Sequence, residues 1–265
     1  MNRSSARRAP IPELGKRAAR AVQQAIGYEH PSELEIEVLA HMRGALVRKT
    51  PIRGARANLI RVGDRGIIGV TEGLSLGERR WAIAHELGHF EAHAGVSFLG
   101  LCSSGDMVSV YETSGREPEA NAFAGELLMP ETLFAKRCDV PVPSWNAVRE
   151  LANEFAVSVT AAAIRFVQLT DERLAVVCAK EGAVAWCTAS KDFGLKPRRG
   201  AKIEEWSEAY EFFRSGKASD KPETVSASAW LDDAEDDEDL VEHVFAIPEL
   251  KTALSLLWWK SDAES

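Results

Sequence analysis

The residues with the clearest capacity for chemistry are two histidines and a glutamate in the sequence His-Glu-Leu-Gly-His, at positions 85–89. On an α-helix, His85 and His89 lie one turn apart and about 40° apart around the axis, so both imidazoles can reach one metal ion. Glu86 lies about 100° from His85 and about 60° from His89, beside such an ion but outside a ligand position. A carboxylate placed there can take a proton from an attacking water and return it to the leaving amine. The spacing predicts a metal site on His85 and His89, with Glu86 as the general base.

The alternative for this segment is a solvated amphipathic helix that carries a histidine pair without function. Histidine is sparse, with six in 265 residues, so the pattern HExxH arises by chance in about one such chain in a hundred. The neighbouring residues are also small or apolar, as in the run Trp-Ala-Ile-Ala at 81–84. A helix buried on nearly all sides must provide partners for its polar side chains, which favours the metal site.

A metal-dependent peptidase needs a third protein ligand, which leaves the fourth position for water. The candidates are His93, Glu117 and Glu119. His93 lies two turns from His85 and about 80° round the helix, so it cannot easily reach the same ion. The segment 116–130 predicts a second helix, and Glu117 falls at the edge of its apolar face. Glu117 is therefore the preferred third ligand, and Glu119 stays open as the alternative.

Neighbouring residues bear on Glu117 in different ways. Ser114 and Glu117 have the spacing of a capping box, which would give Glu117 a purely structural role, and Pro118 disfavours helical geometry at the residue before it. Asn121, one turn after Glu117, can hydrogen-bond a metal ligand and support it. The tetrahedral oxyanion has three candidate stabilisers that the sequence does not separate: His93, Tyr111 and Arg116.

The elements that must position these residues follow from local patterns. Ser75 and Glu78 form a capping box that starts the helix carrying both histidines. In the first half the patterns predict a helix over 12–26, a small meander of strands between 45 and 70, a helix over 78–93, an irregular stretch over 95–114 and a helix over 117–129.

The second half predicts helices first and strands later. Residues 144–169 predict a helix, a tight turn and a second helix. The second helix has only Arg165 and Gln168 as side chains suited to DNA contact, so a role in packing or substrate docking is favoured over DNA binding. Four tryptophans are expected in the core or an interface of the carboxyl-terminal region: Trp206, Trp230, Trp258 and Trp259. The remaining predicted elements are a hairpin over 173–190 around Glu181-Gly182, a helix over 203–214 and strands within 223–231, 240–247 and 253–259.

Composition describes an ordinary globular protein, with 45% hydrophobic and 27% charged residues. No apolar run approaches the roughly 18–20 residues of a membrane span, and the basic amino-terminus has no apolar run behind it, so it does not resemble a secretory signal. The four cysteines form no CxxC pair, which indicates buried thiols in a reducing compartment. We therefore expect a cytoplasmic protein. The net charge is −8, and residues 232–239 alone contain seven acidic residues. Such a run is typical of a solvated loop.

Two motifs together resemble the ImmA/IrrE family of metallo-endopeptidases: HELGH at 85–89, and E-x-x-A-N-x-F-A-x-x-L-L-M-P from Glu117 to Pro130. The resemblance covers at least residues 45–170. It implies that His85 and His89 are zinc ligands, that Glu86 is catalytic, and that Glu117 is the glutamate ligand. It also implies a gluzincin-like core that cleaves a helix-turn-helix transcriptional repressor and so releases stress-response or mobile-element genes.

Together these observations predict an α+β protein in three parts: a zincin-like metallopeptidase domain over 1–135, a helix-turn-helix-like segment over 136–170, and a mixed α/β, regulatory domain over 171–265. The expected cofactor is Zn²⁺, with Mn²⁺ as the alternative. The expected partner is a separate repressor protein, with direct DNA binding disfavoured and no membrane involved. The alternative function is that of a catalytically inactive regulatory protein that binds a repressor or DNA.

Overall fold

The computed structural model describes residues 11–27, 30–92, 99–103, 116–194, 196–232, 234 and 238–260. It divides into two compact units: Met1–Pro130 with Ala152–Ser158, and Glu131–Leu151 with Val159–Ser265. Each unit has its own sheet and helices, which confirms the mixed α+β class. The three-part division at 135 and 170 stays a prediction. Among the described helices, none has both the length and the apolar character that crossing a bilayer needs.

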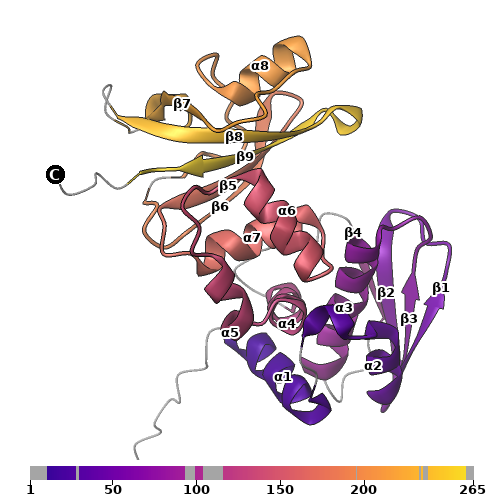
Figure 1. Ribbon diagram of the computed structural model, residues 1–265. Coiled ribbons are helices and arrows are strands. Elements are labelled where there is room, and N and C mark those ends of the chain that lie inside the picture. The colour runs from indigo at the N-terminus through magenta and orange to yellow at the C-terminus, as the bar shows by residue number, and fades with distance from the viewer. Residues whose placement is uncertain are drawn as a thin grey trace, which may run out of the picture. The chain divides into compact units, whose positions relative to one another are not determined.

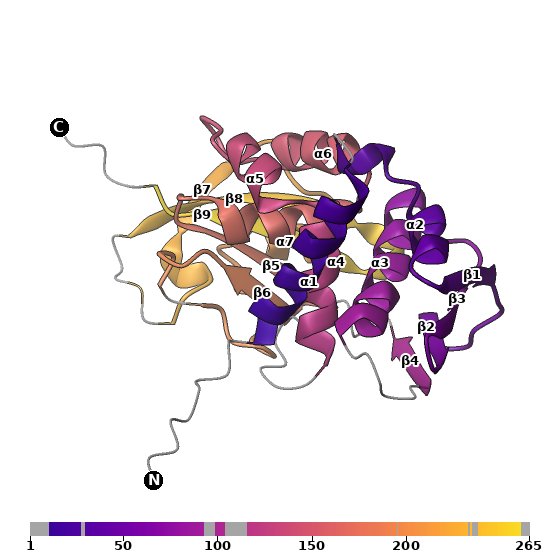
Figure 2. The same cartoon turned by 90° about the horizontal axis from the view of Figure 1, so that it is seen from below.

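The first unit is a small sheet with helices packed on one side of it (Figure 1). α3 lies against the sheet strands, α4 packs on α3, and α1 packs on α4 and α3 (Figure 2). Its elements are α1 (Ile11–Ile26), η1 (Pro31–Glu33), α2 (Ile36–Met42), β1 (Ala45–Lys49), β2 (Ala55–Val62), β3 (Arg65–Val70), α3 (Leu76–Ala92), β4 (Leu99–Ser103) and α4 (Glu117–Leu128).

The strand order of this sheet is β1-β3-β2-β4, so the predicted meander is wrong. β2 and β3 do form an antiparallel hairpin, but β1 pairs with β3 in parallel, on the side away from β2. Turn residues mark where a strand ends and do not determine which neighbour it will pair with. The five residues 50–54 are long enough to carry the chain past one strand position, about 10 Å across two strand spacings.

The predicted irregular stretch over 95–114 is also partly wrong, because 99–103 forms β4 and pairs antiparallel with β2. The run Leu-Gly-Leu-Cys-Ser has no strong strand pattern of its own. Pairing with the open edge of β2 is a long-range contact, and such contacts override weak local preference.

α3 begins at the predicted capping box. The Ser75 N–H donates to the Glu78 carboxylate at 3.0 Å, and the Glu78 N–H donates to the Ser75 hydroxyl at 3.4 Å. At Gly77, a Cβ atom would overlap the backbone of Val157 and Ser158, so only glycine fits where the helix start meets that segment. The prediction of a helix over 78–93 is confirmed to within two residues at the start and one at the end.

The second unit is built on an antiparallel sheet of order β6-β5-β9-β8-β7. The predicted hairpin is confirmed, since Glu181 and Gly182 have φ of 52° and 82°, as a two-residue type I′ turn requires. The elements are α5 (Glu131–Phe134), η3 (Ala135–Arg137), α6 (Trp145–Glu154), α7 (Val159–Leu169), β5 (Leu174–Lys180), β6 (Ala183–Ala189), α8 (Glu208–Ser215), β7 (Glu223–Ser226), η4 (Ala227–Ala229), β8 (Asp239–Ile247), η5 (Pro248–Leu250) and β9 (Thr252–Trp258).

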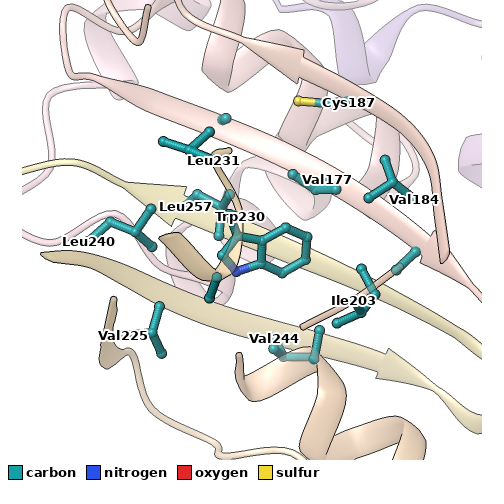
Figure 3. Packing of buried hydrophobic residues seen from close by; sticks show 14 of the residues in the cluster. Val177, Val184, Cys187, Ile203, Val225, Trp230, Leu231, Leu240, Val244 and Leu257 are labelled. Atoms are coloured by element: carbon teal, nitrogen blue, oxygen red, sulfur yellow. The ribbon is translucent and has the colours of Figure 1, made fainter. Parts of the chain in front are cut away.

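The core of this unit gathers on one face of the sheet, where Trp230 packs among aliphatic side chains such as Val177 and Leu257 (Figure 3). Trp230 is buried in the core, whereas Trp206 is 69% exposed, so of its two predicted places, core or interface, it does not occupy the core. Trp206 lies in the turn just before α8, outside any strand or helix that would bury it. Three cysteines are buried free thiols as expected: Cys138, Cys178 and Cys187.

A buried carboxylate on β8 links α8 to the sheet of this unit. Glu242 on β8 accepts hydrogen bonds from the N–H groups of Glu208 and Ala209 at the start of α8, at 2.9 and 3.1 Å. It also accepts from the Trp230 indole at 3.0 Å and the Ser255 hydroxyl at 2.7 Å. Burial raises the pKa of Glu242 in spite of these four donors. The side chain is fully satisfied and serves the fold of the second unit.

Candidate metal centre

The helix that carries the predicted site is buried on nearly every side, as its apolar composition indicates. Exposure is 4% for His85, 0% for Glu86 and 1% for His89. Side chains of this kind cannot be solvated by water at such depth, so their polar atoms must be satisfied by one another or by a ligand. This arrangement excludes the alternative of a solvated amphipathic helix.

Three ligand atoms converge in the first unit, two from α3 and one from α4. The Nε2 atoms of His85 and His89 are 3.1 Å apart. The carboxylate of Glu117 lies 3.1 Å from His85 Nε2 and 3.2 Å from His89 Nε2. Ligands about 2.0–2.1 Å from a tetrahedral ion lie roughly 3.3–3.4 Å from one another. The distance to His85 is measured from Glu117 Oε2 and the distance to His89 from Glu117 Oε1, so one oxygen of the carboxylate lies near each imidazole. One ligand atom from each of the three residues lies within 4.8 Å of the other two, and this group could hold a metal ion.

Glu117, rather than Glu119, reaches the histidines. α4 begins at Glu117, with Arg116 at its amino-terminal cap and Pro118 in the first turn. Proline is tolerated there because the first-turn N–H groups have no partner within the helix, so Pro118 does not displace Glu117. Within the described chain, the only group of three metal-binding side chains contains Glu117 and leaves Glu119 out. Ser114, the partner in the alternative capping box, lies outside the described residues.

The electrostatics of the three groups favour a positive charge between them. Burial by itself would raise the pKa of the Glu117 carboxyl, but hydrogen bonds and charge from His85 and His89 outweigh it and hold that pKa well below its ordinary value. Burial would lower the pKa of His85, yet the Glu117 hydrogen bond and the charges of Glu86 and Glu117 raise it overall. A site that attracts one positive charge in this way suits a cation bound by nitrogen and oxygen ligands.

The sequence of this region matches the IrrE N-terminal-like domain of the Peptidase_M78 family over residues 40–167. Residues 40–167 form a domain of the ImmA/IrrE family. The match includes both histidines, Glu86 and the whole of α4, so the residues that converge in the structure all lie within the family's domain. The resemblance noted from the two motifs is thereby confirmed.

Other similarities are more distant. A solved structure of a Mycobacterium tuberculosis transcriptional regulator is 15% identical, with a TM-score of 0.57, and the match covers 93% of this chain and 76% of that one. At this identity the likeness concerns the fold. No curated protein matches the chain significantly.

In this ImmA/IrrE domain, Asn121 orients one of the two histidines. Its Oδ1 lies 2.9 Å from His85 Nδ1, and because an amide oxygen only accepts, Nδ1 is the protonated nitrogen. Nε2 of His85 is then left with its lone pair toward Glu117 and His89, as a metal ligand requires. The sequence predicted that Asn121 would support a ligand, and in the structure the candidate ligand that it contacts is His85.

We expect Asn121→Ala to weaken Zn²⁺ binding by about 10–100-fold, because the His85 ring loses the partner that holds its orientation and tautomer. Asn121→Asp keeps an oxygen acceptor at the same place and should retain most of the affinity. Competition with a chromophoric chelator measures both dissociation constants. Equal affinity in Asn121→Ala and wild type would contradict this role.

Two glycines near the site were not anticipated from the sequence. A Cβ on Gly88 of α3 would lie 3.0 Å from both the Cα and the carbonyl oxygen of Ala120 on α4, closer than nearly all real contacts. Gly15 of α1 meets the carbonyl oxygen of Glu119 in the same manner. An isolated glycine inside a helical pattern is the available sequence signal for such close approach. Among the oxyanion candidates, His93 and Tyr111 lie outside the described residues, and Arg116 is exposed beside Glu117.

Proposed function

We propose that the protein is a metal-dependent endopeptidase with a zincin-like core, in which His85, His89 and Glu117 hold the ion and Glu86 is the general base. The observation that carries the proposal is the convergence of the two Nε2 atoms and the Glu117 carboxylate at 3.1–3.2 Å, with the fully buried Glu86 next to His85 in the same helix. A protein that only binds a partner has no use for a carboxylate in that position, so the intact Glu86 favours an enzyme.

The chain's own residues supply the proton transfers of hydrolysis. A bound Zn²⁺ or Mn²⁺ would polarise the peptide carbonyl and bring the pKa of water in the site to about 7. Glu86 accepts a proton from the attacking water as it adds to the carbonyl carbon, and later donates that proton to the leaving nitrogen. His85 and His89 stay as neutral ligands, with His85 held by Asn121. Glu86, His85 and His89 are all buried, as is Asn121, and this burial keeps bulk water from competing for the proton.

The proposed substrate is a separate helix-turn-helix transcriptional repressor, whose cleavage would release stress-response or mobile-element genes. The ImmA/IrrE-family domain supports this, and so does the similarity to a protein described as a transcriptional regulator. An extended substrate segment could pair with an edge of the first unit's sheet, where β1 and β4 are the outer strands.

Direct DNA binding by the proposed helix-turn-helix segment finds little support. Arg165, the one basic residue of α7, is only 4% exposed. A buried guanidinium cannot neutralise phosphates, which supply most of the affinity of DNA-binding proteins. α7 is better suited to packing within the second unit.

The decisive experiment is incubation of the zinc-loaded or manganese-loaded protein with each helix-turn-helix repressor of its source organism. We expect one repressor to be cut at one bond, mapped by mass spectrometry, with cleavage abolished by a chelator and restored by adding the metal. The repressor incubated with chelator alone is the control. No cleavage of any repressor, together with a salt-sensitive gel shift on duplex DNA, would instead identify a regulatory binding protein.

A further inference from the structure

α1 lies outside the family's domain, which begins at residue 40, yet it packs directly on the helix that carries Glu117. In Figure 2, α1 runs alongside α4 on the side away from the sheet of the first unit. The buried residues of α1 recur at helical spacing as Gly15, Ala19 and Val22. α1 therefore presents one continuous face to its neighbours.

The two helices approach each other very closely at the first turn of α4. Gly15 is buried, and a Cβ placed on it would overlap the carbonyl oxygen of Glu119 and lie 3.0 Å from the backbone nitrogen of Phe123. The obstacle is backbone, which cannot swing aside as a flexible side chain can. Glu119 is two residues from Glu117, in the same turn.

The opposite end of α4 is held by polar contacts from α1. Arg20 Nε donates to the Glu126 carboxylate at 2.9 Å, and that carboxylate is 2% exposed. Gln23 Nε2 donates to the backbone carbonyl of Glu126 at 2.7 Å. α1 thus contacts α4 near both ends, which determines the position of α4 along its axis as well as its distance from α1.

On its other side, the first turn of α4 touches α3 at the close contact between Gly88 and Ala120. The turn that carries Glu117 is therefore enclosed between a glycine of α3 and a glycine of α1. A Cβ on Gly15 would push this turn toward α3, where the Gly88–Ala120 contact leaves no room, so the turn would have to slide or tilt across α3 and carry the Glu117 carboxylate from its place beside His85 and His89. The distances of 3.1 and 3.2 Å leave little tolerance for such a shift.

We propose that α1 is part of the scaffold of the metal centre, and that Gly15 is a positioning residue that acts on metal binding through Glu117. This inference rests on the proposed metal site. It assigns a role to an element that the family's domain does not include. Helix propensity alone makes the opposite prediction for Gly15→Ala, because alanine is favoured over glycine in a helix interior and should stabilise α1.

The test uses the full chain, stripped of metal and titrated with Zn²⁺ against a chromophoric chelator. The variants are Gly15→Ala, Glu117→Ala and the double variant, with Gly125→Ala as matched control. Gly125 lies in α4 itself, but a Cβ there meets nothing nearer than the Trp81 ring at 3.9 Å. Absorption spectra of the Co²⁺-loaded proteins report the geometry around the ion independently of activity.

We expect Gly15→Ala to raise the dissociation constant for Zn²⁺ by about 10–100-fold, the range for residues that hold a ligand in place. We also expect it to change the absorption spectrum of the Co²⁺-loaded protein. Gly125→Ala should match wild type in both respects. In the Glu117→Ala background, Gly15→Ala should have no further effect, because the ligand on which it acts is absent. A further loss of zinc affinity in the Glu117→Ala background would indicate general loosening of the fold and would overturn the proposal. Wild-type zinc affinity in Gly15→Ala would overturn it as well.

If Gly15→Ala does not fold, Gln23→Ala tests the role of α1 through its contact with the other end of α4, without steric overlap. Its zinc affinity should fall by about two- to tenfold, the equivalent of one hydrogen bond, and an unchanged affinity would overturn the proposal. Failure of the wild type to bind Zn²⁺ or Mn²⁺ would overturn the metal site itself. Wild-type binding with no effect of either α1 variant would overturn only the role of α1.

Discussion

Glu86→Gln should keep the metal affinity of the wild type and lower the rate of peptide cleavage by about 10²–10⁴-fold, the contribution of a well-placed general base. Glutamine has nearly the same size as glutamate, so the buried site is filled, but the amide cannot accept the proton of the attacking water. Glu86 is fully buried in the middle of α3, next to His85. Metal content by elemental analysis and cleavage of the identified repressor are the two measurements.

The matched control for this variant is Glu91→Gln, which makes the same change further along the same helix. The Glu91 carboxylate is bound by Arg43 at 2.7 and 2.8 Å, outside the metal centre. Cleavage by Glu91→Gln should remain near the wild-type rate. If Glu86→Gln still cuts at that rate, the base has been assigned wrongly; if it loses the metal, Glu86 is needed to hold the site together and its effect on cleavage is indirect.

Removing a ligand should have the largest effect on metal binding. We expect wild type to bind one equivalent of metal per chain, and His85→Ala and Glu117→Ala to lose more than about 100-fold in affinity, beyond the 10–100-fold cost of changing a supporting residue. Either change leaves two of the three ligands, too few to define a tetrahedral site. Elemental analysis after dialysis measures the metal that each variant retains.

Glu119→Ala is the control that makes this panel decisive. It removes the same side chain two residues away in the same turn of α4, and the Glu119 carboxylate is not part of the converging group. Its metal content should equal that of wild type. Loss of metal in Glu119→Ala with retention in Glu117→Ala would reverse the assignment of the third ligand. A wild type that takes up neither Zn²⁺ nor Mn²⁺ would remove the basis for a peptidase.

Features that depend on neighbouring residues in one element were predictable from the sequence. The positions of His85 and His89 on one face of a helix follow from the pitch of the helix alone. The capping box at Ser75 and the hairpin around Glu181-Gly182 follow from the preferences of a few adjacent residues. The apolar face predicted for the helix within 116–130 is also buried, since the five residues that form it are each 0% exposed: Ala120, Phe123, Ala124, Leu127 and Leu128.

Features that depend on contacts between elements were missed or left open. The parallel pairing of β1 with β3 and the strand at 99–103 arise from long-range pairing, and local patterns contain no information on which strands will be neighbours. Trp206 was expected in the core or an interface because of its type, and its 69% exposure, which rules out the core, depends on which elements pack around it.

The metal centre shows the same division. The sequence by itself determined the pair of histidines and the glutamate beside them, since these lie within five residues of one helix whose geometry is the same in every protein. Only the tertiary structure decided that Glu117, not Glu119, meets the histidines, that Asn121 bonds His85, and that α1 packs on the ligand helix. The reason is physical: the distance between side chains on two different helices depends on how closely their backbones pack, and here that packing rests on single glycines of α3 and α1.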